Sequence, residues 1–346
     1  MSFTCIDGFS GAGGLSLGLS KAGFDLLFSF DIDRHSIQTQ LLNRKYFNHR
    51  IEELDILDFN PDKIMKELNI KKGELSLFAG GPPCQGFSIQ RIGSDKDYRN
   101  NYVFVFIEKM IALSPKFFLM ENVPGINGKR GKIILQDAMD YAELNGYHIH
   151  KSILNAQDYL VPQRRKRMII VGEKISSSAL KFSFPAPCQK KITVRNTIEY
   201  LPPTPSNGKE HPEIKHHRSD KLSDLNLRRI KYVSEGQGMA FLPEHLLADC
   251  HKIGADKIGH RNVYGRMKWD DVAPTITARF DSFTRGMFGH PEQNRTISLR
   301  EGALLQTFPN DFEFSGNKVD IARQIGNAVP VNLAFALGKA LLKALK

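Results

Sequence analysis

Cys84 lies in the segment with the strongest chemical signal in the sequence. Gly80-Gly81-Pro82-Pro83 directly precedes it and follows a short apolar run, so the glycines and prolines fix an unusual backbone path that presents a cysteine. A thiolate is a good carbon nucleophile when it is partly exposed in an electropositive setting. The segment therefore predicts that Cys84 is a nucleophile.

The other three cysteines are Cys5, Cys188 and Cys250. They lie far apart along the chain and show none of the spacings typical of metal sites. We expect all three to be inert thiols and expect no metal site. So few cysteines in a chain of this size fit a reducing compartment.

A carboxyl group and a pair of arginines complete the candidate catalytic set. Glu121 directly follows an apolar run, and a glutamate in a water-poor pocket can have a raised pKa and act as a general acid. Arg165 and Arg167 precede a predicted strand and share one face if its alternation extends back to them. They could bind phosphate or hold the thiolate and the base, although a solvated charge run is the alternative.

A glycine-rich loop, Phe9-Ser10-Gly11-Ala12-Gly13-Gly14, follows the first predicted strand and opens a helix. Its spacing is G-x-G-G, which weakens a pyrophosphate-binding interpretation and leaves a nucleoside without phosphates, such as S-adenosylmethionine. Asp31 ends the next strand, where an acid commonly contacts ribose hydroxyls, and Asp55 follows the third. The alternatives are a structural turn for the loop and helix caps for the two aspartates.

These residues are positioned by a pattern of short β-rich runs that alternate with helical spacing over the first 175 residues. The pattern predicts a parallel α/β sheet, with polar groups gathered at the carboxyl ends of its strands. After Gly172 the sequence becomes irregular, basic and rich in turns, until a final helix near Leu333–Leu345. The predicted strands are Phe3–Asp7, Leu26–Phe30, a short element ending near Asp55, Leu75–Ala79, Phe117–Met120, His148–Leu154 and Met168–Gly172; the predicted helices of this part are Leu15–Ala22, Val103–Ser114 and Ile133–Leu144.

The 346-residue chain carries a formal net charge of +11 at pH 7. Residues 162–232 hold 16 Lys or Arg against 6 Asp or Glu, a surplus that nearly equals the whole excess. Such a concentrated basic zone predicts a polyanionic partner, against the alternative of a merely soluble basic surface. No run of about 18 apolar residues and no secretory leader is apparent, so we expect neither a membrane partner nor export.

The chain resembles the cytosine-5 DNA methyltransferase family, of the bacterial restriction-modification type, over nearly its whole length. The resemblance rests on six segments in the family's order. They are Phe9–Gly14, Pro83-Cys84-Gln85, Glu121-Asn122-Val123, Gln163-x-Arg165-x-Arg167, Arg300-Glu301-Gly302-Ala303-Leu304-Leu305-Gln306-x-Phe308-Pro309 and Gln324-Ile325-Gly326-Asn327-Ala328-Val329-Pro330.

The resemblance implies transfer of a methyl group from S-adenosylmethionine to carbon 5 of a cytosine within a specific short site in double-stranded DNA. Cys84 would attack carbon 6 of the flipped base, Glu121 would protonate or hydrogen-bond ring nitrogen 3, and Arg165 would orient the base. Flipping costs a few kcal/mol of stacking and pairing. The residues implied at the cofactor are Phe9, Gly11, Gly13, Gly14, Asp31 (where the family usually has glutamate), Ile32, Asp55, Ile56, Pro83, Tyr102, Asn327 and Val329.

The implied fold is an S-adenosylmethionine-dependent methyltransferase (Rossmann-like) sheet with a smaller, irregular target-recognition domain. We expect residues 1–185 to form the catalytic and cofactor-binding domain, residues 186–317 the target-recognition domain, and residues 318–346 a segment that returns to the catalytic domain. Gly236-Gln237-Gly238 is either an ordinary turn or a loop that enters the vacated stack.

We further expect a monomer in the bacterial cytoplasm, paired in function with a restriction endonuclease. Two alternatives keep the family and change the activity: a transfer-RNA cytosine-5 methyltransferase, and a DNA-binding member without catalysis. The long basic region favours DNA over RNA, and the presence of Cys84, Glu121 and Arg165 argues against a non-catalytic member. A nicotinamide dehydrogenase would need a better phosphate loop and would leave the Pro83-Cys84-Gln85 segment unexplained.

Overall fold

A computed structural model describes residues 2–83, 102–176, 181–205, 208–252 and 263–346. Cys84, the predicted nucleophile, lies outside these ranges. The chain divides into two compact units, which are described separately. Unit 1 comprises Met1–Asn155, Lys166–Pro187 and Val329–Lys346, and unit 2 comprises Ala156–Arg165 and Cys188–Ala328.

Unit 1 is built on a seven-stranded sheet in the order β3-β2-β1-β4-β5-β7-β6. The strand order reverses between β1 and β4, which is where open α/β sheets bind their ligands. The mixed α/β class predicted from the sequence is therefore confirmed. The strands are β1 (Thr4–Gly8), β2 (Asp25–Asp31), β3 (Arg50–Glu53), β4 (Leu77–Gly80), β5 (Phe117–Asn122), β6 (Tyr147–Asn155) and β7 (Lys166–Lys174).

The sequence pattern predicted a parallel sheet, but two of the strand pairs in the structure are antiparallel. The first five run parallel, but β7 pairs antiparallel with both β5 and β6. The reason lies in the connection between β6 and β7, which spans only residues 156–165. A parallel crossover needs a dozen or more residues, usually a helix, so this short segment can only reverse the chain.

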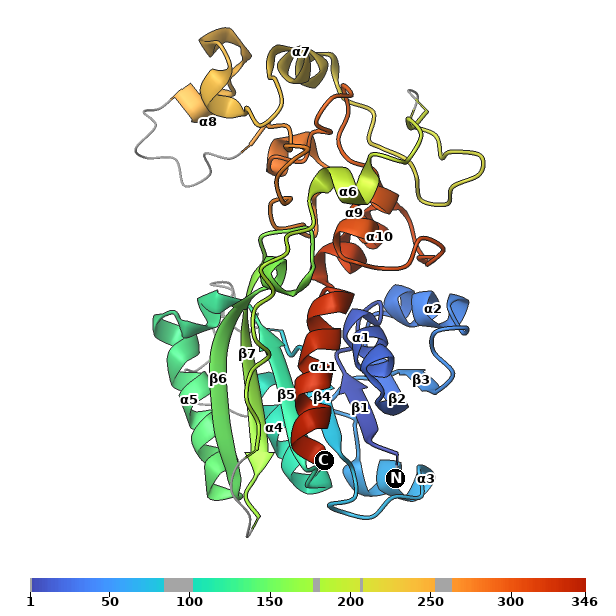
Figure 1. The fold of residues 1–346 in the computed structure, drawn as a ribbon, viewed down its shortest axis with the longest axis vertical. Helices are drawn as coiled ribbons and strands as arrows, with labels where there is room; N and C mark the ends of the chain where they lie inside the picture. Colours follow the sequence, from blue (N-terminus) through green and yellow to red (C-terminus); the bar gives the residue numbers. More distant parts are fainter. Residues whose placement is uncertain (1, 84–101, 177–180, 206–207, 253–262) are drawn as a thin grey trace. The chain divides into compact units, whose positions relative to one another are not determined.

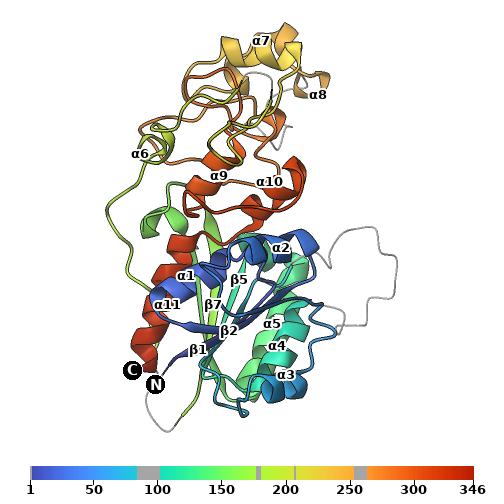
Figure 2. The ribbon, with the colours of Figure 1, turned by 90° about the vertical axis from the view of Figure 1, so that its right-hand side faces the viewer.

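Helices cover both faces of the sheet. Figure 2 shows α1 and α11 on one face and α3, α4 and α5 on the other. Under the second face lies a continuous apolar core that includes Phe28, Phe78, Phe106 and Phe118, each fully buried. The helices of unit 1 are α1 (Gly14–Ala22), α2 (Arg34–Leu42), α3 (Pro61–Glu67), α4 (Tyr102–Leu113), α5 (Lys129–Leu144), α11 (Val331–Leu345) and the short 3₁₀ helix η3 (Pro124–Asn127).

Unit 2 consists of short helices and loops, and in its described part strand pairing is limited to isolated bridges such as Arg266 with Gly289. In Figure 1 the helices α6, α9 and α10 lie together, and α7 and α8 lie apart from them. The elements are η4 (Ala156–Tyr159), α6 (Val194–Ile198), α7 (Asp224–Tyr232), η5 (Met239–Phe241), η6 (Glu244–Leu246), α8 (Asp249–Lys252), η8 (Phe283–Arg285), α9 (Leu299–Leu305) and α10 (Lys318–Asn327).

The C-terminal stretch Lys318–Leu345 is long and apolar enough to cross a membrane by length and composition. It is, however, two helices, since α10 ends before Ala328 and α11 begins after Pro330. The inner side of α11 is buried, and a glycine of α1 packs directly against its backbone. These features are those of a core helix in a globular protein.

The division into units differs in two places from the domain limits expected from the sequence, at residues 185 and 317. The units change after Asn155, Arg165, Pro187 and Ala328. Residues 156–165, which were expected in the catalytic domain, thus fall in unit 2, and the chain returns to unit 1 only after Ala328. The second difference has a physical cause, because α10 belongs with α9 in unit 2 and only α11 packs in unit 1.

Candidate active site

The sheet register brings the predicted site residues of unit 1 to a single edge. Phe30 of β2 pairs with Gly8 of β1, Gly8 pairs with Gly80 of β4, and Gly80 pairs with Met120 of β5. The residues that follow these four are Asp31, Phe9, Gly81 and Glu121. Neighbouring strands lie about 4.8 Å apart, so this row extends over about 14 Å from Asp31 to Glu121.

The glycine-rich loop turns sharply at the end of β1. Phe9 has a φ of 56°, a left-handed conformation that a bulky side chain rarely adopts outside constrained sites. The Ser10 N–H donates to the Phe30 carbonyl, and the Gly13 N–H donates to the Ser10 carbonyl. Gly13 has a φ of 85°, and a Cβ there would lie 2.5 Å from the ring of Phe47, so this position requires glycine.

Asp31 ties the end of β2 to this loop. Its Oδ2 accepts a hydrogen bond from the Gly11 N–H at 2.8 Å, and its Oδ1 accepts one from the Asp33 N–H at 2.8 Å. Gln40, fully buried on α2, supports the same loop by donating to the Gly11 carbonyl. Gln40 could not be predicted from the sequence, because a lone glutamine on a helix has no recognisable pattern.

The surface around this loop suits an adenine nucleoside. A Cβ on Gly11 would have no atom within 4 Å, so open space lies over the loop. Ile32 exposes 63% of its surface beside it, and Phe9 is half-buried, with its ring 5.9 Å from that of Tyr102. An exposed aliphatic side chain and an aromatic face are the groups that stack on a purine.

The remaining predicted cofactor residues of unit 1 differ in what they present. Asp55 is half-buried and its Oδ1 accepts from the Leu57 N–H at 3.0 Å. The side chain of Ile56 is buried in the apolar core, so any contact from this residue is through its backbone. Pro83 is exposed, and Val329 is nearly buried at 8% exposure.

Asp7 is a fully buried acid beneath the loop. Its Oδ2 accepts from the Ser16 hydroxyl, while Oδ1 has no hydrogen-bond partner within the described part of the chain. Burial is the main cause that raises the pKa of Asp7 to about 7; the Ser16 hydrogen bond opposes this rise and the nearby carboxylate of Asp31 adds to it. The sequence interpretation placed Asp7 at the strand end and gave it no role.

Glu121 forms an ion pair with Arg167 across neighbouring strands. The Arg167 Nε lies 2.8 Å from the Glu121 Oε1, and the two side chains are only 11% and 12% exposed. A Cβ on Gly81 would lie 3.6 Å from the Glu121 Oε2, so the carboxylate lies close to the segment that leads to Cys84. Arg167 is therefore the arginine that holds the predicted acid.

Asn122 anchors that same segment. It is 5% exposed, and its Nδ2 donates to the Pro82 carbonyl at 2.8 Å. Two residues before the predicted nucleophile, the backbone is thus fixed to β5, next to Glu121. The expected position of Cys84 itself falls outside the described residues.

Arg165, predicted to orient the base, has a different set of contacts. Its guanidinium is 1% exposed and donates to the carbonyl oxygens of Ile276, Gly326 and Ala328, all in unit 2. Asn327, between the last two, is exposed at the end of α10.

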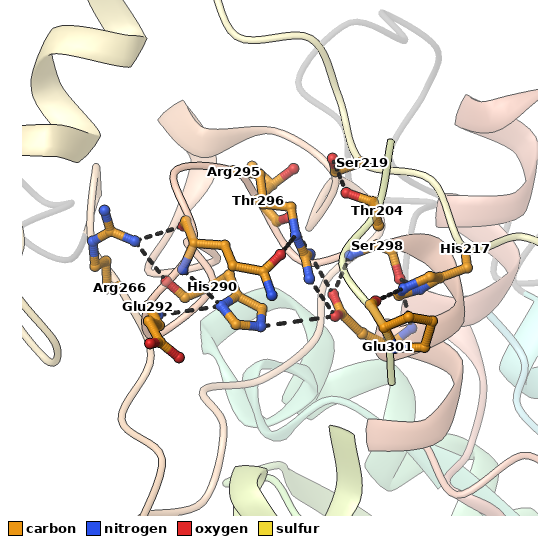
Figure 3. Close-up of polar contacts among 12 residues, drawn as sticks. Thr204, His217, Ser219, Arg266, His290, Glu292, Arg295, Thr296, Ser298 and Glu301 are labelled. Carbon is orange, nitrogen blue, oxygen red and sulfur yellow. Dashed lines mark hydrogen bonds and ion pairs between the residues drawn. The ribbon is translucent and has the colours of Figure 1, made fainter. Parts of the chain in front are cut away.

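Glu301, in the Arg300-Glu301 segment, has a structural role in unit 2, and Figure 3 shows its polar contacts. Glu301 is 1% exposed, and both its oxygens accept from Arg295 at 2.7 Å. Burial alone would raise the pKa of Glu301, but Arg295, with a contribution from His290, holds it at about 2. Burial lowers the pKa of His290 itself to about 4.

Gly236-Gln237-Gly238 forms a turn in this structure. The Gln237 N–H donates to the Ser234 carbonyl, and its side-chain oxygen accepts from the Ser234 N–H at 3.0 Å. Gly236 has a φ of 74°, in the left-handed region that favours glycine.

The chain matches the model of the C-5 cytosine-specific DNA methylase family over residues 3–343. It is 35% identical to the Type II methylase M.HgiDII of Herpetosiphon aurantiacus, covering 99% of this chain and 94% of the relative. It is 34% identical to the Type II methyltransferase M1.HphI of Haemophilus parahaemolyticus, covering 99% and 87%.

Solved structures agree with these relatives. The crystal structure of a "putative DNA modification methyltransferase" encoded within a prophage (E. coli) superimposes with a TM-score of 0.73 at 27% identity, covering 99% of both chains. The Entamoeba histolytica methyltransferase EhMeth, at 17% identity and a TM-score of 0.66, shares the fold.

The chain therefore belongs to the C-5 cytosine-specific DNA methylase family. It is a DNA (cytosine-5)-methyltransferase, and its methyl donor is S-adenosylmethionine. The open space over Gly11, flanked by Phe9 and Ile32, fits the nucleoside of that donor.

Proposed function

We propose that this protein is the modification enzyme of a Type II restriction-modification system. It would methylate one cytosine within a short site in double-stranded DNA, as a monomer in the bacterial cytoplasm, alongside a restriction endonuclease of the same specificity. The printed names of its relatives, Type II methylase and Type II methyltransferase, support this proposal. Unit 1 would carry the chemistry, and unit 2, with most of the basic surplus, would recognise the target.

The observation that carries the chemistry is the placement of Glu121. It lies in one row with the glycine-rich loop, is paired with Arg167, and is close to the segment that presents Cys84. A flipped cytosine at this edge would meet a carboxyl group and a thiol together, and the row extends on to the donor-binding loop.

Each group then has one task. The Cys84 thiolate adds to carbon 6 of the ring, and Glu121 protonates or hydrogen-bonds ring nitrogen 3, which accepts the displaced electron pair. Bound S-adenosylmethionine supplies an electrophilic methyl group. Once carbon 5 has gained the methyl, loss of its proton restores the double bond and expels Cys84. Arg167 keeps the Glu121 carboxyl group aimed at the base.

The test combines substrate choice with trapping of the adduct. Labelled methyl transfer should occur on duplex DNA and not on transfer RNA, and bisulfite sequencing of DNA from expressing cells should reveal one protected motif. An oligonucleotide with 5-fluorocytosine in that motif should trap a covalent complex, because carbon 5 then carries no proton to lose.

The matched variants are Cys84→Ser, which should form no adduct, and Cys188→Ser, which alters an exposed cysteine of unit 2 and should react normally. Methylation of transfer RNA alone, or an adduct that survives in Cys84→Ser, would refute the proposal.

A further inference from the structure

Asp7 is a buried acid without a counter-cation in the described part of the chain. It is 0% exposed, its Oδ2 accepts from the Ser16 hydroxyl, and its Oδ1 has no hydrogen-bond partner there. The groups that shift its pKa are Ser16 and Asp31, and neither is a cation. A buried carboxylate normally has a hydrogen-bonded cationic partner, because removing a charge from water is costly. The described residues thus provide no positive charge to balance Asp7.

The groups around Asp7 make this place more favourable for a cation. Asp31, at the end of β2, adds a second carboxylate, and Cys5 lies two residues earlier on β1 itself. The adjoining strands place Ser29 and Ala79 beside Asp7 in the register, and these side chains carry no charge. Two acids therefore meet here, in a chain whose formal net charge is +11. The local potential favours a positively charged ligand over a neutral one.

Asp7 lies directly beneath the loop assigned to the methyl donor. β1 ends one residue after Asp7, the glycine-rich loop Phe9–Gly14 follows, and Ser16 lies in the first turn of α1 beyond it. The hydrogen bond from Ser16 to Asp7 therefore spans the base of the loop. Asp31 contacts the same loop, since its Oδ2 accepts from the Gly11 N–H at 2.8 Å, and open space lies over Gly11. A buried charge one loop away from a ligand is little screened by salt.

The reaction changes the charge of the ligand at this loop. S-adenosylmethionine carries a permanent positive charge on its sulfonium, whereas the product, S-adenosylhomocysteine, is a neutral thioether with the same nucleoside and amino acid parts. Contacts to those shared parts cannot distinguish the two ligands. A fixed negative charge can, because two unit charges about 10 Å apart, at an effective dielectric constant of about 20, attract each other enough for roughly a tenfold difference in binding.

We infer that Asp7 is a specificity-determining residue for the methyl donor: its buried carboxylate favours binding of the sulfonium cation over the neutral product. After each methyl transfer, this preference favours exchange of the product for fresh donor. The inference goes beyond the proposed function, because it concerns the donor alone and depends neither on the recognised DNA nor on a restriction endonuclease.

The preference should follow the ionisation of Asp7. Burial, the main cause, raises the pKa of this carboxyl group to about 7, so near neutral pH part of the protein holds Asp7 protonated and uncharged. A bound cation stabilises the carboxylate, which lowers that pKa and releases a proton. Donor affinity should therefore rise with pH through this range, whereas affinity for the neutral product should stay nearly constant.

Calorimetry of donor and product binding, without DNA, tests the inference on the parent protein and on Asp7→Asn. At pH 6.5, in two buffers of different ionisation enthalpy, the parent should release about half a proton per bound donor and much less per bound product. From pH 5.5 to pH 8 the ratio of donor affinity to product affinity should increase by about five- to tenfold. Titration of the amino acid part, which both ligands share, cancels in this ratio. In Asp7→Asn, whose amide oxygen can still accept from Ser16, both the proton release and the increase should be lost.

The matched control is Asp62→Asn, which removes the charge of an exposed acid in the first turn of α3, also in unit 1. It should keep the proton release and the pH dependence of the parent. Ser16→Ala is a second variant, which keeps the inference testable if Asp7→Asn does not fold. It removes a hydrogen bond that lowers the pKa of Asp7, so the rise in donor preference should move to higher pH.

Equal proton release for donor and product overturns the inference, as does an affinity ratio that does not change with pH in the parent. So does a ratio that still rises with pH in Asp7→Asn, or a midpoint that stays in place in Ser16→Ala. A parent protein that binds no donor overturns it as well. Because the measurement uses no DNA, a missing adduct with 5-fluorocytosine DNA would refute the proposed function and leave this inference standing.

Discussion

At the scale of single residues, Glu121 depends on one close partner. Arg167 lies 2.8 Å from its carboxylate, and neither side chain is more than 12% exposed. In such a place the partner fixes both the orientation of the carboxyl group and its electrostatic environment.

We predict that Arg167→Gln lowers kcat by about 100-fold or more, the usual contribution of a positioned acid. Arg167→Lys should be intermediate, because it keeps the charge and loses the planar fork. Single-turnover methylation of a duplex oligonucleotide measures both. Lys166→Gln, at the exposed neighbour, should be normal; if it matches Arg167→Gln, the effect belongs to the local charge and not to the contact.

The sequence could not show which of the two arginines, Arg165 or Arg167, contacts Glu121. Alternation along the predicted strand placed Arg165 and Arg167 on one face. In the structure β7 begins at Lys166, so Arg165 precedes the strand and the alternation does not reach it. Glu121 was predictable because it follows a clear apolar run, whereas the partners of Arg165 lie more than 110 residues away in sequence.

Asp7 offers a prediction about pH. Its pKa is raised from 3.8 to about 7, so between these values the folded protein binds a proton that the unfolded chain has lost. The free energy of unfolding therefore falls as pH rises through this window, by about 1.4 kcal/mol for each pH unit at most.

Asp7→Asn removes the titrating group and should remove this dependence. The free energy of unfolding of the variant minus that of the parent should be larger at pH 8 than at pH 5, by a few kcal/mol. Urea unfolding at the two pH values gives the comparison, and the same difference at both values would contradict it. Ser16→Ala, which removes the hydrogen bond and keeps the acid, should preserve the pH dependence.

At the scale of elements, the packing of α1 on α11 places the glycine-rich loop. The loop opens directly into α1, so the position of that helix sets the position of Gly13 and Gly14. Gly18 lies at the contact: a Cβ there would be 2.3 Å from the Ala334 Cβ and 2.5 Å from the Val331 carbonyl oxygen. The helices can approach this closely only through glycine.

Gly18→Ala should therefore destabilise the protein by about 1–3 kcal/mol, although alanine favours a helix by about 1 kcal/mol. Chemical denaturation measures the loss, and donor affinity should fall with it because the loop moves with α1. Gly125→Ala, where a Cβ would meet nothing within 4 Å, is the control. Equal stability of the two variants would show that the helices adjust freely.

The elements also divide into those that the sequence could and could not predict. The strands were predicted to within a few residues, because they are buried apolar runs and several of them end at an acidic residue. Helix α1 was predicted equally well, because Gly23 marks its end. Helix α10 was missed, although Asn317 and Asp320 form a capping box at its start. The antiparallel direction of β7 was missed because run lengths do not report direction, whereas the length of the connection does.

At the scale of the whole molecule, charge is distributed unevenly between sequence regions. The surplus between residues 162 and 232 lies mainly in unit 2, whose functional role rests on this composition and on the family. Phosphate contacts supply affinity without reading sequence, so basic side chains of unit 2 should act on all DNA alike. Lys190 and Lys191 are an exposed adjacent pair near Cys188, where the second segment of unit 2 begins.

Replacing both lysines with glutamine should weaken binding to cognate and unrelated duplexes by the same factor. Each phosphate contact contributes about 0.9 to the slope of log K against log salt, so the slope should become shallower by about 1 to 2. Fluorescence anisotropy at several salt concentrations measures this slope.

The matched control pair is Lys71 and Lys72, which are also exposed and adjacent. They precede β4 at the edge of the sheet opposite Glu121. The same double change there should leave the slope unaltered. If both pairs change it equally, net charge alone drives binding, and the basic surplus of unit 2 has no special place in DNA recognition.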